Sequence, residues 1–336
     1  MVTTGQSRFL AASLVLLLFL LVACSESSVP TTAAPATLPS ASPTNANTPL
    51  PPTPTVTATV APPTSSATAP ATATVTQTLE AEADAGCSAA ENEGTVLDGV
   101  FYSATAGADH AYRLYLPPCY EDDGRRYPTL YLLAGNIHDH TKWDELGVDE
   151  AVEALIHAQE IAPLLIVMPD GGWLANNTSG GPGSYESLIL DELIPHVEAE
   201  QCAWPDARGR AIGGLSRGGY WALEIAFRFP QLFTSVGGHS AALLDQYAGP
   251  QVNPQSTALN NDLGDLRIYL DIGADDYLRT NTIQLHEDME AAGVSHTWRL
   301  NEGRHEDTYW AAHVDEYIRW YAEPFARDRA SYPPCE

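Results

Sequence analysis

Gly214-Leu215-Ser216-Arg217-Gly218-Gly219 is a glycine-rich hexapeptide with a single serine. It lies between an apolar, strand-like run at residues 211–213 and a helix-like run at residues 220–229. A serine on so tight a turn between a strand and a helix needs glycine two residues before it and two residues after it, because a Cβ at either position would clash with neighbouring segments. The stretch therefore predicts a nucleophile elbow that presents Ser216 at the end of a buried strand.

Continuous apolar runs alternate with helix-period segments along the rest of the domain. The runs typical of strands are residues 130–133, 164–168, 211–215 and 268–272, and the clearest helical segments are residues 148–160 and 185–199. Strands that are apolar throughout are buried on both faces, and their alternation with helices indicates a mostly parallel sheet. Residues 110–116 alternate in character instead, which predicts an early antiparallel strand. We expect an α/β fold with a mostly parallel, doubly wound sheet flanked by helices.

The serine needs a base and a third group that holds the base, and in this architecture the acid and then the histidine follow the serine in the chain. His305 lies in a loop after the last expected strand, residues 297–300. The loop after the strand at residues 268–272 offers Asp276, which we favour as the acid, and Asp275 as the alternative. Asp271 is expected to lie inside that strand.

An oxyanion needs two backbone N–H donors in a dry site, each worth on the order of a hundredfold or more in rate. One should be the N–H of Arg217, at the start of the helix after the elbow. The other should come from Asn136 or Ile137, in the loop after the strand that ends at Leu133. The side chain of Arg217 is expected to point at the cleft or at solvent, as a substrate contact or a surface residue.

The first 23 residues have the features of a secretion signal. An apolar run at residues 9–22 follows Arg8 and is too short for a spanning helix. It ends in Leu21-Val22-Ala23-Cys24, which resembles the lipobox of bacterial lipoproteins, where the signal is cut before a cysteine that then carries lipid. The resemblance implies lipidation of Cys24, and an ordinary secretory signal is the alternative. Both predict an extracytoplasmic protein, at the cell surface or membrane if it is anchored.

Residues 24–85 are expected to be a disordered linker, and residues 86–336 the folded domain. From Ser25 to about Leu79 the linker is rich in Thr, Pro, Ala and Ser and almost free of charge, so it cannot bury enough apolar surface to fold.

The net charge is −27, from 16 Lys and Arg and 43 Asp and Glu residues. Within the first 79 residues only Arg8 and Glu26 are charged, and they cancel, so the whole net charge lies on the rest of the chain. So acidic a domain should repel phosphate backbones and anionic lipid surfaces. We therefore expect no nucleic-acid partner, and membrane contact only through the lipid anchor.

Several motifs in the domain resemble those of one enzyme family. Besides the elbow and the His305 loop, they are Tyr115-Leu116-Pro117-Pro118, Tyr131-Leu132-Leu133-Ala134-Gly135, Val167-Met168-Pro169-Asp170-Gly171 and Glu192-Leu193-Ile194-Pro195. Over residues 112–321 they resemble the esterase family that includes feruloyl and acetyl-xylan esterases, S-formylglutathione hydrolase, enterochelin esterase and the antigen 85 mycolyltransferases. The resemblance implies the α/β-hydrolase fold, with Ser216 as nucleophile, Asp276 as acid and His305 as base.

The chain departs from that family at two positions. Ala134 stands where many relatives have histidine, and Cys119 stands where relatives often have glycine. A disulfide at Cys119 would explain the second departure.

Four cysteines remain once Cys24 is assigned to lipid, and in an exported chain they are candidates for two disulfides with three possible pairings. In the hydrolase architecture the strands that follow Cys119 and Cys202 are parallel neighbours, which would bring both cysteines to one edge of the sheet. We expect Cys119 to pair with Cys202 and Cys87 to pair with Cys335. Free, buried cysteines are the alternative.

His138-Asp139-His140 could supply metal ligands, yet two histidines in one polar loop are more often plain loop residues, and no fourth ligand is apparent. We expect neither a metal nor a cofactor. Trp143 and Trp173 could line a substrate cleft or serve in packing.

These features together predict an exported serine carboxylic-ester hydrolase that works through an acyl-enzyme. The resemblance implies small-molecule or carbohydrate-linked esters as substrates, such as acyl or feruloyl esters of carbohydrates. One alternative is acyl transfer to a sugar, as in the mycolyltransferases. Another is a non-catalytic lipoprotein that binds polysaccharide.

Overall fold

The computed structural model describes residues 87–89, 91–120, 124–244 and 248–335. The expected signal at residues 1–23, the lipidation site Cys24 and the linker at residues 24–85 lie outside this part of the chain. Within it, no helix combines the length and the apolar character that crossing a membrane requires.

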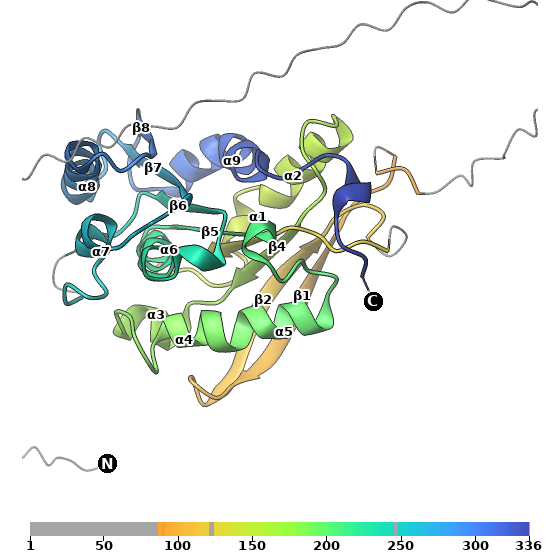
Figure 1. The fold of residues 1–336 in the computed structure, drawn as a ribbon, viewed down its shortest axis with the longest axis horizontal. Helices are drawn as coiled ribbons and strands as arrows, with labels where there is room; N and C mark the ends of the chain where they lie inside the picture. Colours follow the sequence, from red (N-terminus) through yellow and green to blue (C-terminus); the bar gives the residue numbers. More distant parts are fainter. Residues whose placement is uncertain (1–86, 90, 121–123, 245–247, 336) are drawn as a thin grey trace, which may run out of the picture. The chain divides into compact units, whose positions relative to one another are not determined.

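An eight-stranded sheet forms the centre of the domain (Figure 1), in the order β1-β2-β4-β3-β5-β6-β7-β8. The strands are β1 Thr95–Ser103, β2 Ala108–Leu116, β3 Thr129–Leu133, β4 Leu165–Pro169, β5 Arg210–Leu215, β6 Ser235–His239, β7 Arg267–Gly273 and β8 Thr297–Asn301. β2 pairs antiparallel with both β1 and β4, and every other neighbouring pair is parallel. The predicted mostly parallel sheet with an early antiparallel strand is confirmed.

Helices cover both faces of this sheet. They are α1 Lys142–Glu145, α2 Val148–His157, α3 Gly172–Asn177, α4 Tyr185–Ser187, α5 Ile194–Glu200, α6 Arg217–Arg228, α7 Pro254–Asn260, α8 Arg279–Ala292 and α9 Asp307–Ala322. On one face Leu130 and Leu132 of β3 join a core with residues of α2 and α9, and on the other Tyr131 and Leu133 join a core with residues of α6. Successive side chains of a strand point to opposite faces, so β3 is buried throughout, as its apolar run predicts.

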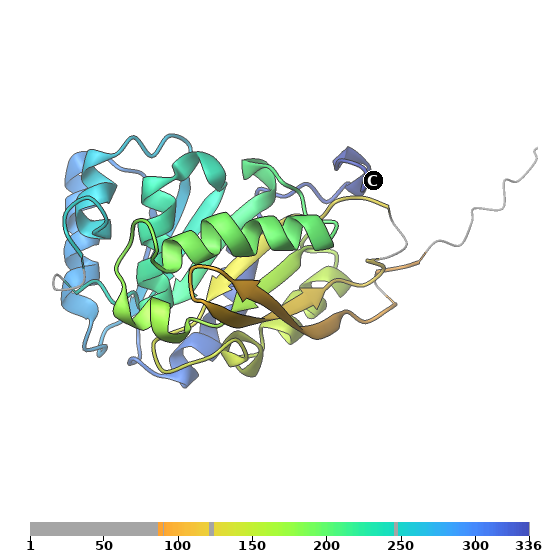
Figure 2. The same cartoon turned by 90° about the horizontal axis from the view of Figure 1, so that it is seen from below.

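The β1–β2 hairpin packs along the helical segment formed by α4, a π-helical turn at Leu188–Leu193, and α5 (Figure 2). Ser103 Oγ donates to Glu192 Oε2 at 2.5 Å, and the Tyr112 hydroxyl lies 3.2 Å from His196 Nε2. These polar contacts hold the antiparallel end of the sheet to the helix that the sequence predicts at residues 185–199.

Two strands, β1 and β6, were not predicted from the sequence. β6, Ser-Val-Gly-Gly-His, holds a single large apolar side chain, so it lacks the continuous apolar run by which the other parallel strands were recognised. Its residue Gly237 is required because a Cβ there would lie 1.9 Å from the hydroxyl of Tyr321. β1 is an edge strand whose side chains are mostly exposed or half-buried, and its pattern is correspondingly weak.

The expected disulfide pairing is wrong. The bonds join Cys87 to Cys119 and Cys202 to Cys335, with Cα–Cα distances of 5.6 and 5.5 Å. Cys119 and Cys202 do lie at the same edge of the sheet, since the Cys202 N–H donates to the hydroxyl of Tyr120 at 2.8 Å. Each nevertheless bonds to a segment from one end of the domain.

The reason for the observed pairing is the path of the carboxyl-terminal segment. The N–H of Cys335 donates to the Gly124 carbonyl and the N–H of Arg126 donates to the Pro333 carbonyl, both at 2.9 Å. This brings Cys335 beside Cys202 and leaves Cys119 to Cys87. Cys119 has φ +63°, a left-handed conformation that favours glycine.

Candidate active site

Ser216 stands on a strained turn between β5 and α6, with φ +54° and ψ −117°. A Cβ on Gly214 would lie 2.3 Å from the backbone carbon of Gly218, and a Cβ on Gly218 would lie 2.1 Å from the carbonyl oxygen of Leu133. Both positions therefore require glycine, because the atoms that a Cβ would meet belong to the backbone and cannot move aside. Strain of this kind is typical of functional positions.

The structure brings Ser216, His305 and Asp276 together. His305 Nε2 lies 2.8 Å from Ser216 Oγ, and His305 Nδ1 lies 2.8 Å from Asp276 Oδ2. Asp276 is fully buried, and its other carboxylate oxygen accepts the N–H of Leu278 at 2.8 Å. A buried carboxylate with these partners favours the tautomer in which His305 donates from Nδ1 and keeps Nε2 as an acceptor for the serine proton.

The two other aspartates of this region do not reach His305. Asp275 is exposed in the same loop as Asp276. Asp271 lies inside β7, as expected, and its carboxylate contacts His239 at 2.7 Å.

The loop after β3 packs against the elbow. A Cβ on Gly135 would lie 3.0 Å from Leu215, and the carbonyl of Asn136 accepts a hydrogen bond from the side chain of Asn176 on α3 at 2.8 Å. Within the described residues, the backbone N–H groups of Asn136 and Ile137 donate to no backbone carbonyl.

The side chain of Arg217 lies neither at solvent nor at the cleft surface, so both expectations for it are wrong. It is 3% exposed, its Nε donates to the Ala175 carbonyl at 2.8 Å, and its guanidinium also donates to the Thr178 carbonyl. The guanidinium lies over the rings of Tyr220 and Trp221, at 4.3 and 5.0 Å from their centroids. Arg217 thus ties the end of α3 to the helix that follows the nucleophile.

Three large apolar side chains remain exposed on the segments around the serine. Ile137 is 85% exposed beside Asn136, Trp173 is 70% exposed on α3, and Tyr277 is 74% exposed next to Asp276. The ring of Tyr277 lies edge-on to His305 with 4.8 Å between centroids. Of the three, the sequence suggested only Trp173 as a cleft side chain, since Ile137 was considered for its backbone N–H; the position of Tyr277 directly after the expected acid was the signal that could have found it.

The remaining candidates serve in packing. Trp143 is buried and donates from Nε1 to the Leu133 carbonyl at 3.1 Å. His138 lies edge-on to Trp310, and burial lowers its pKa from the ordinary value. Among the residues that the structure describes, no three His, Cys, Asp or Glu side chains are grouped so as to hold a metal ion.

Sequence analysis also missed a second His–Asp pair. His239, the last residue of β6, and Asp271 of β7 are both fully buried, and they are register partners in the sheet. A lone aspartate within an apolar strand was the available signal, because a buried carboxylate requires polar partners.

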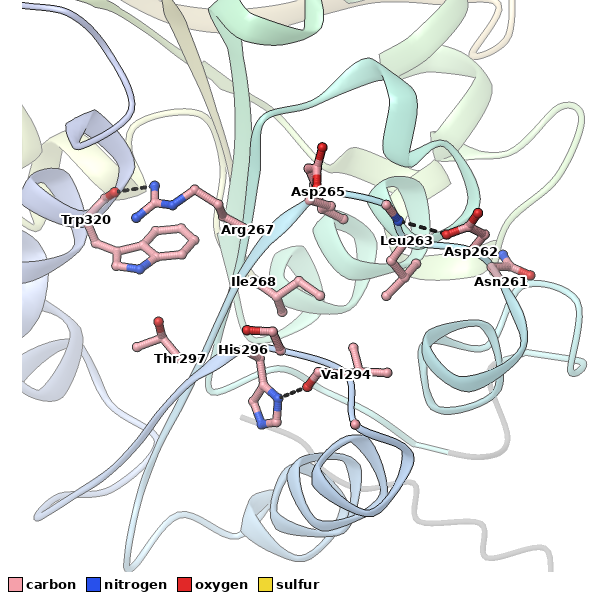
Figure 3. Close-up of a pocket in the computed structure, with 14 residues that line it drawn as sticks. Asn261, Asp262, Leu263, Asp265, Arg267, Ile268, Val294, His296, Thr297 and Trp320 are labelled. Carbon is pink, nitrogen blue, oxygen red and sulfur yellow. Dashed lines mark hydrogen bonds between the residues drawn. The ribbon is translucent and has the colours of Figure 1, made fainter. Parts of the chain in front are cut away.

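A pocket of about 660 Å³ lies at the starts of β7 and β8 (Figure 3). Because β5 runs parallel to these strands and Ser216 follows its carboxyl end, the pocket is at the opposite end of the strands from Ser216. It is lined at the start of β7 by Arg267 and at the start of β8 by His296 and Thr297. Arg267 donates to the Trp320 carbonyl and His296 Nδ1 lies 2.8 Å from the Val294 carbonyl, so these polar groups already have partners within the domain. The pocket contains none of the three residues that meet at the elbow.

Comparison with protein families gives a match over most of the domain. The sequence model of the family described as "Putative esterase" matches residues 103–321. An esterase of Mycobacterium tuberculosis is 33% identical over 147 residues, which are 42% of this chain and 31% of that protein. An endo-1,4-beta-xylanase/feruloyl esterase of Xylanibacter ruminicola is 31% identical over 153 residues, 42% of this chain and 21% of that protein. The chain spans less than a third of the length of these curated relatives.

Solved structures show the same fold. A ferulic acid esterase with 26% identity has a TM-score of 0.64 and covers 70% of this chain and 100% of its own. An S-formylglutathione hydrolase from Staphylococcus aureus, at 19% identity, has a TM-score of 0.59 and covers 69% of this chain and 97% of its own. The expected α/β-hydrolase fold is confirmed.

Proposed function

The chain belongs to the putative esterase family, and from this premise we propose that it is a serine carboxylic-ester hydrolase. The observation that carries the proposal is the pair of 2.8 Å hydrogen bonds that link Ser216 to His305 and His305 to Asp276. Ser216 follows the carboxyl end of β5 and precedes α6, the position of a nucleophile in an elbow of this kind. The esterase names of the relatives support the same reaction class.

The proposed reaction has two steps. Ser216 Oγ attacks the acyl carbon while His305 Nε2 takes its proton, and the alcohol leaves with that proton as the acyl-enzyme forms. Water then attacks the acyl carbon with His305 as base, and the acid and free serine result. Asp276 holds the imidazole and stabilises its charged form in both steps.

The oxyanion of each tetrahedral intermediate would be held by backbone N–H groups. The N–H of Arg217 at the start of α6 is one donor, and the N–H of Asn136 or Ile137 is the other. The favourable field of a helix amino terminus adds to the first donor. The buried side chain of Arg217 supports this arrangement by fixing the start of α6 against α3.

For the substrate, we favour acyl or feruloyl esters of carbohydrates. The exposed side chains of Ile137, Trp173 and Tyr277 offer apolar surface that an aromatic or acyl group could contact. The feruloyl esterase activity named for a relative is consistent with such a group.

We place the protein outside the cytoplasm, anchored through lipid on Cys24. Two disulfides support an oxidising compartment.

The test is hydrolysis of short-chain p-nitrophenyl esters and methyl ferulate by the protein and by its Ser216→Ala variant. Turnover that disappears in the variant supports the proposal, and the relative rates define the acyl preference. Product analysis with an added sugar acceptor separates hydrolysis from acyl transfer. Absence of turnover on every ester, with polysaccharide binding that survives Ser216→Ala, would favour the non-catalytic alternative.

A further inference from the structure

A fully buried polar cluster lies directly beneath the nucleophile elbow. Its centre is the pair His239 and Asp271, joined by a 2.7 Å contact between Nδ1 and Oδ1. Neither residue has any exposed surface, so the pair cannot meet a substrate. Its function must be exerted through the residues around it.

Three tyrosines complete this cluster, all from α9. The hydroxyls of Tyr309 and Tyr317 donate to Asp271 Oδ2, each at 2.7 Å, and the hydroxyl of Tyr321 lies 3.0 Å from His239 Nε2. Burial, with the nearby Asp271 carboxylate, raises the pKa of Tyr309, of Tyr317 and of Tyr321, so all three remain proton donors. The carboxylate of Asp271 accepts two hydrogen bonds from Tyr309 and Tyr317 and one from His239, which together offset the cost of its burial.

The cluster reaches the serine through the backbone. The carbonyl of His239 accepts the N–H of Ser216 at 2.9 Å. The carbonyl of Asp271 accepts the N–H of Ser240 at 2.9 Å, and the N–H of Ala242 donates to the Ser216 carbonyl at 2.8 Å. The end of β6 is therefore hydrogen-bonded to the strained turn at Ser216, and the backbone of Asp271 is hydrogen-bonded to the end of β6.

The same cluster also reaches the segments of the acid and the base. Asp271 lies five positions before Asp276 on the same strand and loop. Tyr309 receives a 3.2 Å hydrogen bond from the side chain of Asn301, at the end of β8, and its ring packs on Gly303, where a Cβ would lie 2.6 Å from it. Gly303 precedes His305 by two residues, so Tyr309 sets the path of the loop that carries the base.

We infer that His239, Asp271 and Tyr309 are positioning residues that align Ser216, Asp276 and His305 from the interior of the domain. The inference rests on the proposed catalytic function of those three residues. Ser216, Asp276 and His305 follow three different strands, β5, β7 and β8. The cluster joins β6, β7 and the segment after β8 through side-chain hydrogen bonds. A shift of a few tenths of an ångström in any of them would lengthen a 2.8 Å contact on which proton transfer depends.

Tyr309 and Tyr317 provide a matched pair of variants. Both hydroxyls donate to the same carboxylate oxygen at the same distance from the same helix, and both side chains are buried. Of the two, only Tyr309 is shown in contact with the segment that leads to His305, through Asn301 and Gly303. Tyr309→Phe should therefore lower kcat about tenfold with KM changed less than twofold, and slow the labelling of Ser216 by a fluorophosphonate by a similar factor. Tyr317→Phe should lower the melting temperature as much but lower kcat clearly less than Tyr309→Phe does.

A second variant removes a hydrogen bond that links Tyr309 to the segment before His305. Asn301→Ala removes the hydrogen bond from β8 to Tyr309 and should lower kcat about threefold, again with little change in KM.

The inference is overturned if Tyr309→Phe and Tyr317→Phe lose activity equally, or if neither loses activity, while Ser216→Ala abolishes turnover. In that event the proposed esterase activity stands and the cluster serves stability alone. If the native protein hydrolyses no ester and Ser216 is not labelled, the proposed function fails and the inference fails with it.

Discussion

The α-carbon of Gly218 lies so close to Leu133 that a Cβ would come within 2.1 Å of its carbonyl oxygen. This contact presses the start of α6 against the end of β3, and so sets the elbow beside the loop that holds Asn136. The nucleophile and its expected oxyanion donors are placed by the same backbone contact.

Gly218→Ala should therefore prevent correct folding of the elbow. A methyl group at 2.1 Å from a backbone oxygen forces main-chain displacement, which costs at least about 1–3 kcal/mol. The variant should show a lower melting temperature and no ester turnover. Gly249→Ala is the control, because its Cβ would meet only Gln251 at an ordinary 3.5 Å. A Gly218→Ala variant with native activity would show that the contact is not as close as described.

Exchanging Asp276 for asparagine should lower kcat by about 10³-fold or more, because the amide favours the wrong tautomer of His305. Asp275→Asn, one residue away and exposed, should change kcat less than twofold. Steady-state kinetics on one p-nitrophenyl ester measures both. A larger loss in Asp275→Asn would assign the acid to the other carboxylate.

Trp173→Ala should raise KM for methyl ferulate about tenfold and change kcat less than twofold, because stacking of an aryl group on the exposed indole contributes about 1–1.5 kcal/mol. Tyr102→Ala removes an equally exposed aromatic, at 68%, from the edge strand β1 and should have no effect. Equal KM values for native protein and Trp173→Ala would remove Trp173 from the acyl site.

The stability of the protein should depend on the pH through Asp149. Burial, with a hydrogen bond to Glu150, raises the pKa of Asp149 to about 7, whereas an unfolded aspartate titrates near 4, as a rough reference value. Between these pH values the folded protein holds a proton that the unfolded chain has released, so this group lowers the free energy of unfolding as the pH rises.

Asp149→Asn lacks that titration. Its gain in melting temperature over the native protein should increase from about pH 4 to about pH 7 and stay constant above. Thermal unfolding of both proteins across this range measures the difference. A gain that does not change with pH would contradict the raised pKa.

Much of this structure could be predicted from short stretches of the sequence. The strand at Thr129–Leu133 and the elbow at Ser216 were predicted because a buried apolar run and a glycine-flanked serine each reflect a requirement of their immediate surroundings. The grouping of Ser216, Asp276 and His305 was predicted from their order in the chain, from their places after expected strands and from the family resemblance. What could not be predicted depends on segments far apart in sequence.

The misses share that cause. Cys202 bonds to Cys335 because the carboxyl-terminal segment returns along Gly124, and no pattern near either cysteine indicates that path. The side chain of Arg217 is buried because α3 supplies two carbonyls for it. β6 is short of apolar side chains because Tyr321 of α9 occupies the space above its glycine.

Mass spectrometry of the protein after reaction with a fluorophosphonate shows directly whether Ser216 is the nucleophile. We expect one covalent adduct on Ser216, formed far more slowly in His305→Ala and absent in Ser216→Ala. An unlabelled protein, or an adduct on another serine with Ser216 unmodified, would contradict it.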